Sequence, residues 1–431
     1  MAENGVAMQL INGSRIVIVG GGPAGSFTAL HLLRLAREMH LDLAVTILEV
    51  RDFNRPGPGG CNRCAGILSS TLVQNLKMLG LSLPPEVIQA ELNTYVLHLS
   101  GRELPIRQPD PSQRIFSVYR GSGPRWGDPP FPHSFDGWLL HQAQLQGATV
   151  QRAQVRAISP GHRPIVATAH ENLQADLVVL ATGVNARAPL DPAWGYRPPH
   201  TEMMAQNEIP LPGGLSNNRV HIFFDYPPGL VFGALIPKGR YANISLLGHK
   251  LPATAINDFL EGQGLFSLFP GRVPLLCSCR PRVAVSPARG YYADRLVVVG
   301  DAAVTRLYKD GIGAAFQTAA AAARTAIQQG VSRQDFAAGY RPVCRRITLD
   351  NFYGRLLFRL WAVTRRSPIL LDTCRQMILA EADLPPAAQS YTRIVWSMFT
   401  GDETYQRVFW LLFRHPAFHS LWQSLVKTWE A

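Results

Sequence analysis

Short apolar runs rich in β-branched residues alternate with helical patterns through much of this chain. Residues 15–19 (RIVIV) form one run, a helical pattern covers residues 26–39, and a second run covers residues 43–48. Two more runs occur at residues 176–183 (DLVVLATG) and 295–303 (RLVVVGDAA). Unbroken apolar runs of this length are typical of strands buried in a parallel sheet. The pattern therefore predicts an α/β fold.

A different pattern occupies the middle of the chain. Residues 220–225, 230–236 and 241–247 alternate or run apolar, and Pro and Gly turns separate them. In the first segment Val220, Ile222 and Phe224 share one face of the expected strand. This spacing predicts an antiparallel sheet on the substrate side of the molecule.

The last hundred residues are expected to be helical. Residues 350–363, 369–379, 391–399 and 405–413 carry leucines and aromatic residues three or four positions apart. Residues 331–431 contain 13 Lys and Arg and 8 Asp and Glu, a net charge of +5. Basic residues beside apolar ones are typical of helices on an anionic membrane surface. A helical cap over a substrate cavity would show the same pattern.

Composition limits the classes of protein to consider. With 47% hydrophobic and 17% charged residues the chain can bury a sizeable core, which argues against disorder. The net charge of +12 favours an anionic partner. A nucleic acid is not expected, because the sequence contains no motif of a known nucleic-acid-binding domain and no lysine-rich block. We find no signal-peptide pattern and no apolar stretch of about 18 residues. We therefore expect a cytoplasmic location, with peripheral contact to a membrane left open.

A glycine-rich turn connects the first strand to the first helix. Gly20, Gly22 and Gly25 satisfy G-x-G-x-x-G within GGGPAG, which also includes Pro23 and Ala24. The first glycine permits a tight turn, the second lets the backbone approach a pyrophosphate, and the third lets helix and strand pack closely. The helix N-terminus offers free N–H groups and a positive dipole end to phosphates.

An acidic residue completes this motif. Glu49 ends the second strand, 24 residues after Gly25, where a carboxylate can accept hydrogen bonds from ribose hydroxyls. These features predict a dinucleotide site, and the acid argues against a 2′-phosphate on the nucleotide.

Two later strand ends suggest an extended flavin dinucleotide. Gly183 ends one run, and Asp301, expected to bind ribityl hydroxyls, ends the other. Lys309 either adds positive charge beside the flavin or faces solvent. The start of the next helix is expected to face the flavin pyrimidine ring through the N–H groups around Gly311, Ile312 and Gly313.

With these features the chain resembles the FAD-dependent family of para-hydroxybenzoate hydroxylase-like monooxygenases and geranylgeranyl reductases. Four segments between residues 15 and 330 carry the resemblance: GGGPAG with Glu49, FDGWLLHQA (135–143), DLVVLATG, and RLVVVGDAA followed by GIGAA. The resemblance implies that Arg120, rather than Arg125, contacts the flavin ribityl–phosphate region. A surface arginine is the alternative.

The expected architecture is a Rossmann-type FAD-binding domain that an antiparallel-sheet substrate domain interrupts, followed by a C-terminal helical extension. The FAD-binding domain would comprise residues 14–90, 116–190 and 286–330, the substrate domain residues 91–115 and 191–285, and the extension residues 331–431.

Two segments favour the geranylgeranyl reductase branch. Residues 59–68 (GGCNRCAGIL) are similar to its cysteine–glycine loop, which gives Cys64 a catalytic or substrate-gating role. Residues 232–238 (FGALIPK) are similar to its Tyr-x-Trp-x-Phe-Pro-Lys segment, whose aromatics line a prenyl tunnel. This likeness assigns Phe232, Ala234 and Ile236 to substrate binding, although an ordinary core strand would look the same. Because the branch has tryptophan where Ala234 stands, the substrate is expected to differ from geranylgeranyl. A flavin-dependent halogenase is disfavoured, since both of its tryptophans are absent here.

The resemblance implies an FAD-dependent reductase that saturates C=C bonds of an apolar, prenyl-like or other lipid substrate. NAD(P)H or a ferredoxin-like donor would supply the electrons. An aromatic monooxygenase and a flavin electron-transfer or binding subunit of a membrane-associated complex are the alternatives.

Four of the six cysteines form close pairs, Cys61/Cys64 and Cys277/Cys279. We expect small, semi-buried residues rather than a metal site, with a Cys61–Cys64 disulfide left open.

Overall fold

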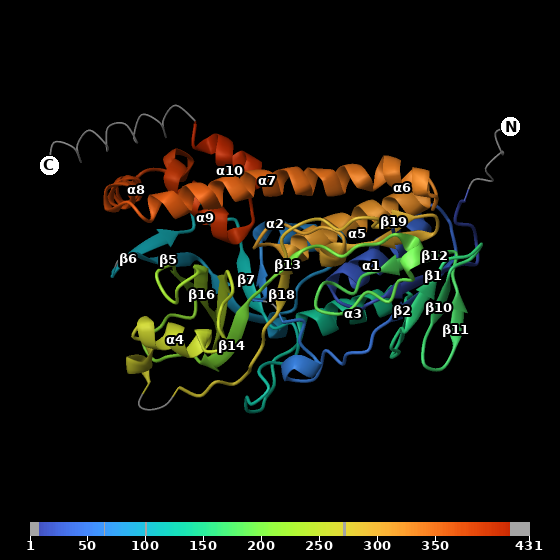
Figure 1. The fold of residues 1–431 in the computed structure, drawn as a ribbon, viewed down its shortest axis with the longest axis horizontal. Helices are drawn as coiled ribbons and strands as arrows, with labels where there is room; N and C mark the ends of the chain where they lie inside the picture. Colours follow the sequence, from blue (N-terminus) through green and yellow to red (C-terminus); the bar gives the residue numbers. More distant parts are fainter. Residues whose placement is uncertain (1–7, 64, 100, 270–272, 414–431) are drawn as a thin grey trace.

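Two six-stranded sheets lie next to each other along the molecule, and helices cover them (Figure 1). The computed structural model describes residues 8–63, 65–99, 101–269 and 273–413. Its mixture of a mainly parallel sheet, a mainly antiparallel sheet and C-terminal helices confirms the predicted fold class.

The first sheet has the strand order β19-β20-β12-β1-β2-β8 and is parallel apart from the β19–β20 pair. Its strands are β1 (Ser14–Val19), β2 (Leu43–Leu48), β8 (Thr149–Gln151), β12 (Leu177–Leu180), β19 (Tyr292–Ala293) and β20 (Leu296–Val298). Val19 pairs with both Leu180 and Leu48, so the C-terminal ends of β1, β2 and β12 meet at one edge of the sheet. The turns that the sequence singled out therefore lie together.

Two helices pack on this sheet and on each other. Helix α1 (Pro23–Glu38) begins three residues earlier than predicted. Proline is favourable in the first turn, because the N–H that it lacks would have no partner within the helix. Helix α5 (Gly311–Gln328) presents many alanines, which allow close packing, and its Phe316 ring contacts Phe27 of α1 edge-on at 5.1 Å. Helices α2 (Ser70–Met78) and α3 (Phe135–Leu145) complete this region.

The second sheet has the order β14-β17-β16-β15-β5-β6. Its strands are β5 (Thr94–Leu99), β6 (Arg102–Arg107), β14 (Ala205–Pro210), β15 (Arg219–Phe223), β16 (Leu230–Lys238) and β17 (Tyr241–Gly248). The expected antiparallel pairing holds except between β5 and β15, which are parallel because they belong to separate stretches of chain. Side chains alternate across the sheet, so Val220, Ile222 and nearby Phe224 share one apolar cluster as predicted.

Smaller sheets and one further helix connect these parts. They are the sheet β3 (Ile67–Leu68), β7 (Ile115–Val118) and β4 (Ile88–Leu92), the sheet β9 (Ala157–Ser159), β10 (Ile165–Ala167) and β11 (Asn172–Gln174), the pair β13 (Thr201–Met203) and β18 (Arg282–Ala284), and helix α4 (Ala255–Gly262). The domain boundaries drawn from the sequence remain a prediction.

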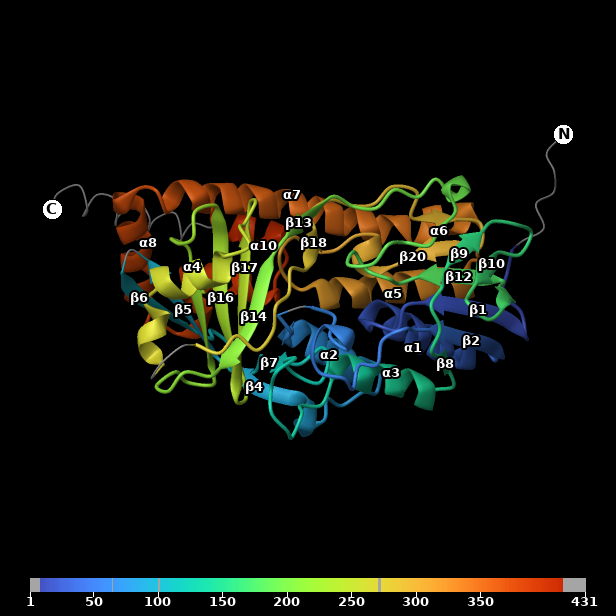
Figure 2. The same ribbon diagram turned by 60° about the horizontal axis from the view of Figure 1, so that its bottom comes forward.

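The C-terminal part is helical, as expected, and covers both sheets. Its helices are α6 (Arg333–Gly339), α7 (Arg341–Thr364), α8 (Pro368–Ala380), α9 (Ser390–Thr400) and α10 (Tyr405–Leu411). The long helix α7 runs lengthwise over the molecule in both views (Figures 1 and 2). Within the described ranges, none of the helices combines the length and apolar character needed to cross a membrane.

Candidate functional site

One cavity of about 970 Å³ joins the two sheets. Its wall includes the glycine-rich turn at the end of β1, the start of α5, one face of β16, and side chains of α7 and α9. Seven arginines line it against four carboxylates among the described residues. The arginines are Arg51, Arg63, Arg120, Arg156, Arg187, Arg282 and Arg306, and the acids are Glu49, Asp191, Asp301 and Asp310. An anionic ligand suits this balance of charge.

The glycine-rich turn leaves no room for side chains. Gly20 has φ +107°, and a Cβ there would lie 2.6 Å from the carbonyl oxygen of Ala181. A Cβ on Gly25 would lie 1.9 Å from the carbonyl oxygen of Gly20. Gly25 therefore packs helix against strand, and it does not itself line the cavity, unlike Gly20, Gly22, Pro23 and Ala24.

Glu49 holds this turn from the end of β2. One carboxylate oxygen accepts a hydrogen bond from the Gly21 N–H at 2.7 Å, and the other accepts one from the Arg51 N–H at 2.8 Å. Each oxygen keeps a further lone pair, and the residue lines the cavity. Its position is the one a ribose-binding acid requires.

Asp301 and the start of α5 form the opposite side of the cavity. Asp301 is half-buried, and its partial removal from water raises the pKa of its carboxyl, against a lowering by Thr305 and Arg120. Gly311 and Ile312 line the cavity beside it, as does Gly183 at the end of β12. Gly313 does not, because it packs against Asp310, whose carboxylate would lie 2.4 Å from an added Cβ.

Arg120 is a buried residue of the cavity wall, not a surface arginine. Its guanidinium donates to the carboxylate of Asp136 in α3, with Nη2 and Oδ2 2.9 Å apart. Asn62 donates to the same carboxylate and accepts from Arg51. This network orients two arginines beside the glycine-rich turn. Arg125, the alternative that the sequence disfavoured, is exposed.

The expectation that the Lys309 side chain faces solvent is wrong. Its ammonium is buried and donates to the carbonyl of Ser397 in α9, with the Tyr405 ring 4.2 Å away. Burial, followed by the charge of Arg306, lowers its pKa well below the usual value. The residue therefore joins α9 and α10 to the turn before α5. Because Lys309 also lines the cavity, its role beside a flavin stays a prediction.

The apolar part of the cavity lies over the second sheet. Phe232, Ala234 and Ile236 line it from β16, with Val220 and Ile222 beside them on β15. Across the cavity lie Phe358 of α7 and Met398 and Phe399 of α9. The three substrate candidates thus face a cavity and not only a packed core.

The two cysteines of the loop at residues 59–68 remain without an assigned role. Cys64, the catalytic candidate, lies outside the described residues, so its role and a disulfide with Cys61 stay open. Burial raises the pKa of the Cys61 thiol to about 11, which disfavours the thiolate.

Tyr95 and Thr182 are among the residues of the cavity wall that the sequence analysis did not identify. Their buried hydroxyls have no hydrogen-bond partner among the described residues. Thr182 lies within the DLVVLATG segment, and its position before Gly183 could have indicated it. No local motif marks Tyr95, because tertiary packing alone brings it to the cavity.

The site fits FAD on these observations. A Cβ on Gly22 would meet only the Asn62 amide, at 3.0 Å, so the backbone there is open to a close ligand. No described side chain caps the N-terminus of α1, which leaves its N–H groups for a pyrophosphate. The unpartnered Thr182 hydroxyl and the surrounding arginines supply further polar contacts.

Solved structures of other proteins share the fold of this chain. No protein-family model and no curated protein matches the chain. A geranylgeranyl bacteriochlorophyll reductase-like structure from Thermoplasma acidophilum is similar over 97% of this chain and 100% of that one, with a TM-score of 0.64 and 14% identity. The flavin-dependent halogenase CmlS matches over 94% and 77% of the two chains, with a TM-score of 0.59 and 16% identity.

A third similar structure is the p-nitrophenol 4-monooxygenase PnpA from Pseudomonas putida, over 96% of this chain and 99% of that one, with a TM-score of 0.56 and 14% identity. These similarities extend over both sheets and the helices that cover them. The chain therefore has the fold of the FAD-dependent oxidoreductases that include geranylgeranyl reductase-like proteins, flavin-dependent halogenases and hydroxylases.

Proposed function

We propose that this protein is an FAD-dependent oxidoreductase that acts on an apolar substrate, and that it reduces C=C bonds of a prenyl-like or other lipid chain. The observation that carries the proposal is the single cavity that joins the glycine-rich turn to the apolar face of β16. A dinucleotide held at one end and an apolar chain lying over Phe232, Ala234 and Ile236 at the other would share this space.

The residues of the chain bind and orient in this scheme. Bound FAD supplies the hydride chemistry. The first turn of α1 and Arg120 would hold its phosphate side, and Glu49 would accept from its ribose. The N-terminus of α5, at Gly311 and Ile312, would stabilise negative charge that develops on the reduced ring.

Proton delivery has two candidates. Cys64 stays a prediction from the resemblance. Tyr95 is buried at the cavity wall, and burial raises the pKa of its hydroxyl, so it remains protonated at neutral pH. A protonated phenol that has no hydrogen-bond partner among the described residues can donate a hydrogen bond to a substrate.

A hydroxylase is the second candidate. It is favoured by the similarity to p-nitrophenol 4-monooxygenase and by the arginine-lined part of the cavity, which would accept an anionic aromatic ring. A flavin electron-transfer or binding subunit would use the same FAD site and convert no small molecule.

The proposal includes two partners outside the chain. The electron donor is NAD(P)H or a ferredoxin-like protein, and the two are distinguished by which of them reduces the bound flavin. An anionic membrane that the C-terminal helices contact would deliver a lipid substrate to the cavity.

Product mass decides between the candidates. Reduced protein is incubated without oxygen with a polyunsaturated prenyl lipid, and in parallel with NAD(P)H, oxygen and a set of phenols. We expect a gain of two mass units in the lipid. A gain of sixteen units in a phenol would identify a hydroxylase, and flavin reduction without any product would favour the electron-transfer role.

A cavity-filling variant links this activity to β16. Ala234→Trp places an indole in the cavity and should lower kcat/KM for a long prenyl chain at least roughly tenfold while FAD content is unchanged. Ala169→Trp, at an exposed turn between β10 and β11, is the control and should leave kcat/KM unchanged. Full activity in Ala234→Trp would place the substrate elsewhere.

A further inference from the structure

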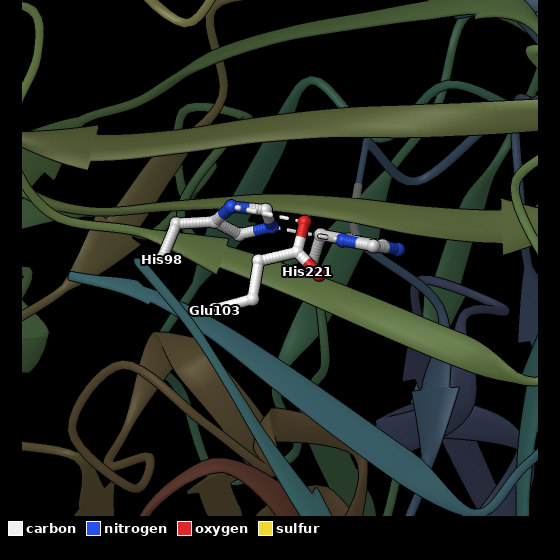
Figure 3. Close-up of side chains that lie close together, drawn as sticks. All are labelled: His98, Glu103 and His221. Atoms are coloured by element: carbon white, nitrogen blue, oxygen red, sulfur yellow. Dashed lines mark hydrogen bonds and ion pairs between the residues drawn. The ribbon is translucent and has the colours of Figure 1, made fainter. Parts of the chain in front are cut away.

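Three side chains on the second sheet converge on the face that points away from the cavity. His98 lies on β5, Glu103 on the edge strand β6, and His221 on β15 (Figure 3). His98 pairs directly with Glu103 across one ladder and with Phe223 across the other, so His221 is its diagonal neighbour. Side chains alternate along strands, and the intervening Leu97 and Ile222 belong to the cluster on the opposite face.

The ligand atoms of these residues are close together. His98 Nε2 and His221 Nδ1 are 2.9 Å apart. The Glu103 carboxylate comes within 3.8 Å of the other ring nitrogen of His98, Nδ1, which cannot bind the same ion as Nε2. One potential ligand atom from each residue lies within 4.8 Å of the others. Two nitrogens bound to one Zn²⁺ at about 2.0–2.1 Å in tetrahedral geometry would be about 3.3 Å apart, close to the separation seen here.

We propose that His98, His221 and Glu103 form a site for a divalent transition-metal ion of the zinc class. Two imidazoles and one carboxylate are ligands that Zn²⁺, Co²⁺ and Ni²⁺ accept, whereas Mg²⁺ and Ca²⁺ prefer oxygen ligands alone. Across the described residues, this is also the one group of three or more such side chains with metal-ligand spacing, and the cysteines form none.

The surroundings prepare the two imidazoles for a metal. The Phe223 ring stacks on His98 with centroids 4.1 Å apart, which fixes the ring plane. Arg219 beside His221 opposes a cation, and Glu103 compensates this charge.

The position of the site suggests its role. Glu103 is exposed on the edge strand β6, while His221 is buried two strands away. An ion held by all three residues would fasten the edge strand to the centre of the sheet. Three protein ligands leave a fourth position for water on the solvent side. A stabilising role is therefore expected, independent of FAD.

Cobalt titration tests the site directly. Full-length protein without a histidine tag is treated with a chelator and titrated with Co²⁺ while its visible absorption is recorded. We expect one equivalent with a d–d spectrum typical of nitrogen and oxygen ligands, displacement by Zn²⁺, and a rise of a few degrees in Tm with metal. Absence of binding would leave a hydrogen-bonded histidine pair and overturn the proposal.

Variants separate this site from other metal-binding groups. His98→Ala should weaken binding at least roughly 100-fold and Glu103→Gln about tenfold. His249→Ala is the control, because His249 likewise lies beside a carboxylate, Glu202 at 3.3 Å, but belongs to no group of metal-ligand spacing among the described residues. Circular dichroism without metal checks folding. Unchanged affinity in His98→Ala, or a thiolate charge-transfer band that indicates the cysteines, would contradict the assignment.

Discussion

Asp136 is fully buried, and Arg120 neutralises its charge inside the wall of the cavity. Arg120→Ala would leave the buried Asp136 carboxylate without its guanidinium partner, although the Asn62 amide still donates to it. We expect this variant to lose about 3 kcal/mol in the free energy of unfolding of the apoprotein. Urea denaturation measures the loss.

Two comparisons make this result specific. Arg114→Ala removes an exposed pair with Glu91 and should cost at most about 1 kcal/mol, because water screens that pair. Adding Asp136→Ala to Arg120→Ala should restore part of the loss, since no uncompensated charge remains. Equal losses in the free energy of unfolding for Arg120→Ala and Arg114→Ala would show that the buried ion pair stabilises the fold no more than the exposed one.

The glycine-rich turn gives a second prediction at the residue scale. Gly22→Val puts a branched side chain where the backbone is open toward the cavity, so FAD should be retained at less than about a tenth of the wild-type level. Gly213→Ala serves as control, because its added Cβ would meet nothing within 4 Å. Flavin content per chain after gel filtration is the measurement, and wild-type content in Gly22→Val would remove the assignment.

Residues within motifs could be predicted from the sequence, whereas residues brought in by packing could not. Gly20, Gly22 and Glu49 lie where the pattern put them, because strand, turn and helix are local structures. The contacts of Lys309 could not be predicted, because its partners, Ser397 and Tyr405, come from helices about ninety residues later. Local sequence carries no signal for such a contact.

At the scale of elements, the packing of α1 on α5 predicts a dependence of stability on pH. His31 of α1 lies against Phe316 of α5, and burial, with smaller effects of Arg34 and Arg324, lowers its pKa to about 4. In the unfolded chain its pKa is about 6.5. Between about pH 6.5 and pH 4, His31 is therefore protonated in the unfolded state but neutral in the folded state. The free energy of unfolding falls as the pH is lowered through this range.

This effect amounts to about 3 kcal/mol between those two pH values. His31→Gln cannot take up the proton, so its free energy of unfolding should fall by correspondingly less over the same range. The slope with pH, obtained from denaturation curves at several pH values, is compared rather than the absolute stability. Identical slopes for variant and wild type would show that His31 does not titrate in this way.

The type and order of the helices and strands could be predicted from the sequence better than the contacts between them. The periodicity of residues 391–399 predicts a helix, and α9 is found there. That α9 closes the cavity through Met398 and Phe399 depends on the turn before α5, where Arg306 donates to the carbonyls of Gly401 and Glu403, each at 2.6 Å.

At the scale of the whole molecule, α7 carries an apolar stripe on its solvent side. Leu349, Phe352, Leu360 and Val363 are 50–59% exposed and lie within one arc of the helix. The exposed arginines Arg345, Arg346 and Arg359 lie along or beside this stripe. Apolar residues flanked by basic ones suit an anionic membrane surface.

Vesicle binding tests this surface. Leu360→Asp with Val363→Asp should reduce sedimentation with vesicles that contain phosphatidylglycerol at least roughly fivefold, since each carboxylate opposes burial and repels the lipid charge. Leu145→Asp, at an exposed apolar position at the end of α3, should have no effect. No binding of wild-type protein, or equal binding of both variants, would contradict a membrane contact through α7.

The central claim is that the cavity between the two sheets binds FAD for oxidoreductase chemistry. Its most direct test is the identity and amount of flavin in the purified full-length protein, measured by absorption and by mass spectrometry of the released cofactor. The account predicts a yellow protein that carries close to one FAD per chain, or takes it up on reconstitution. A colourless protein that cannot be reconstituted with FAD would contradict it.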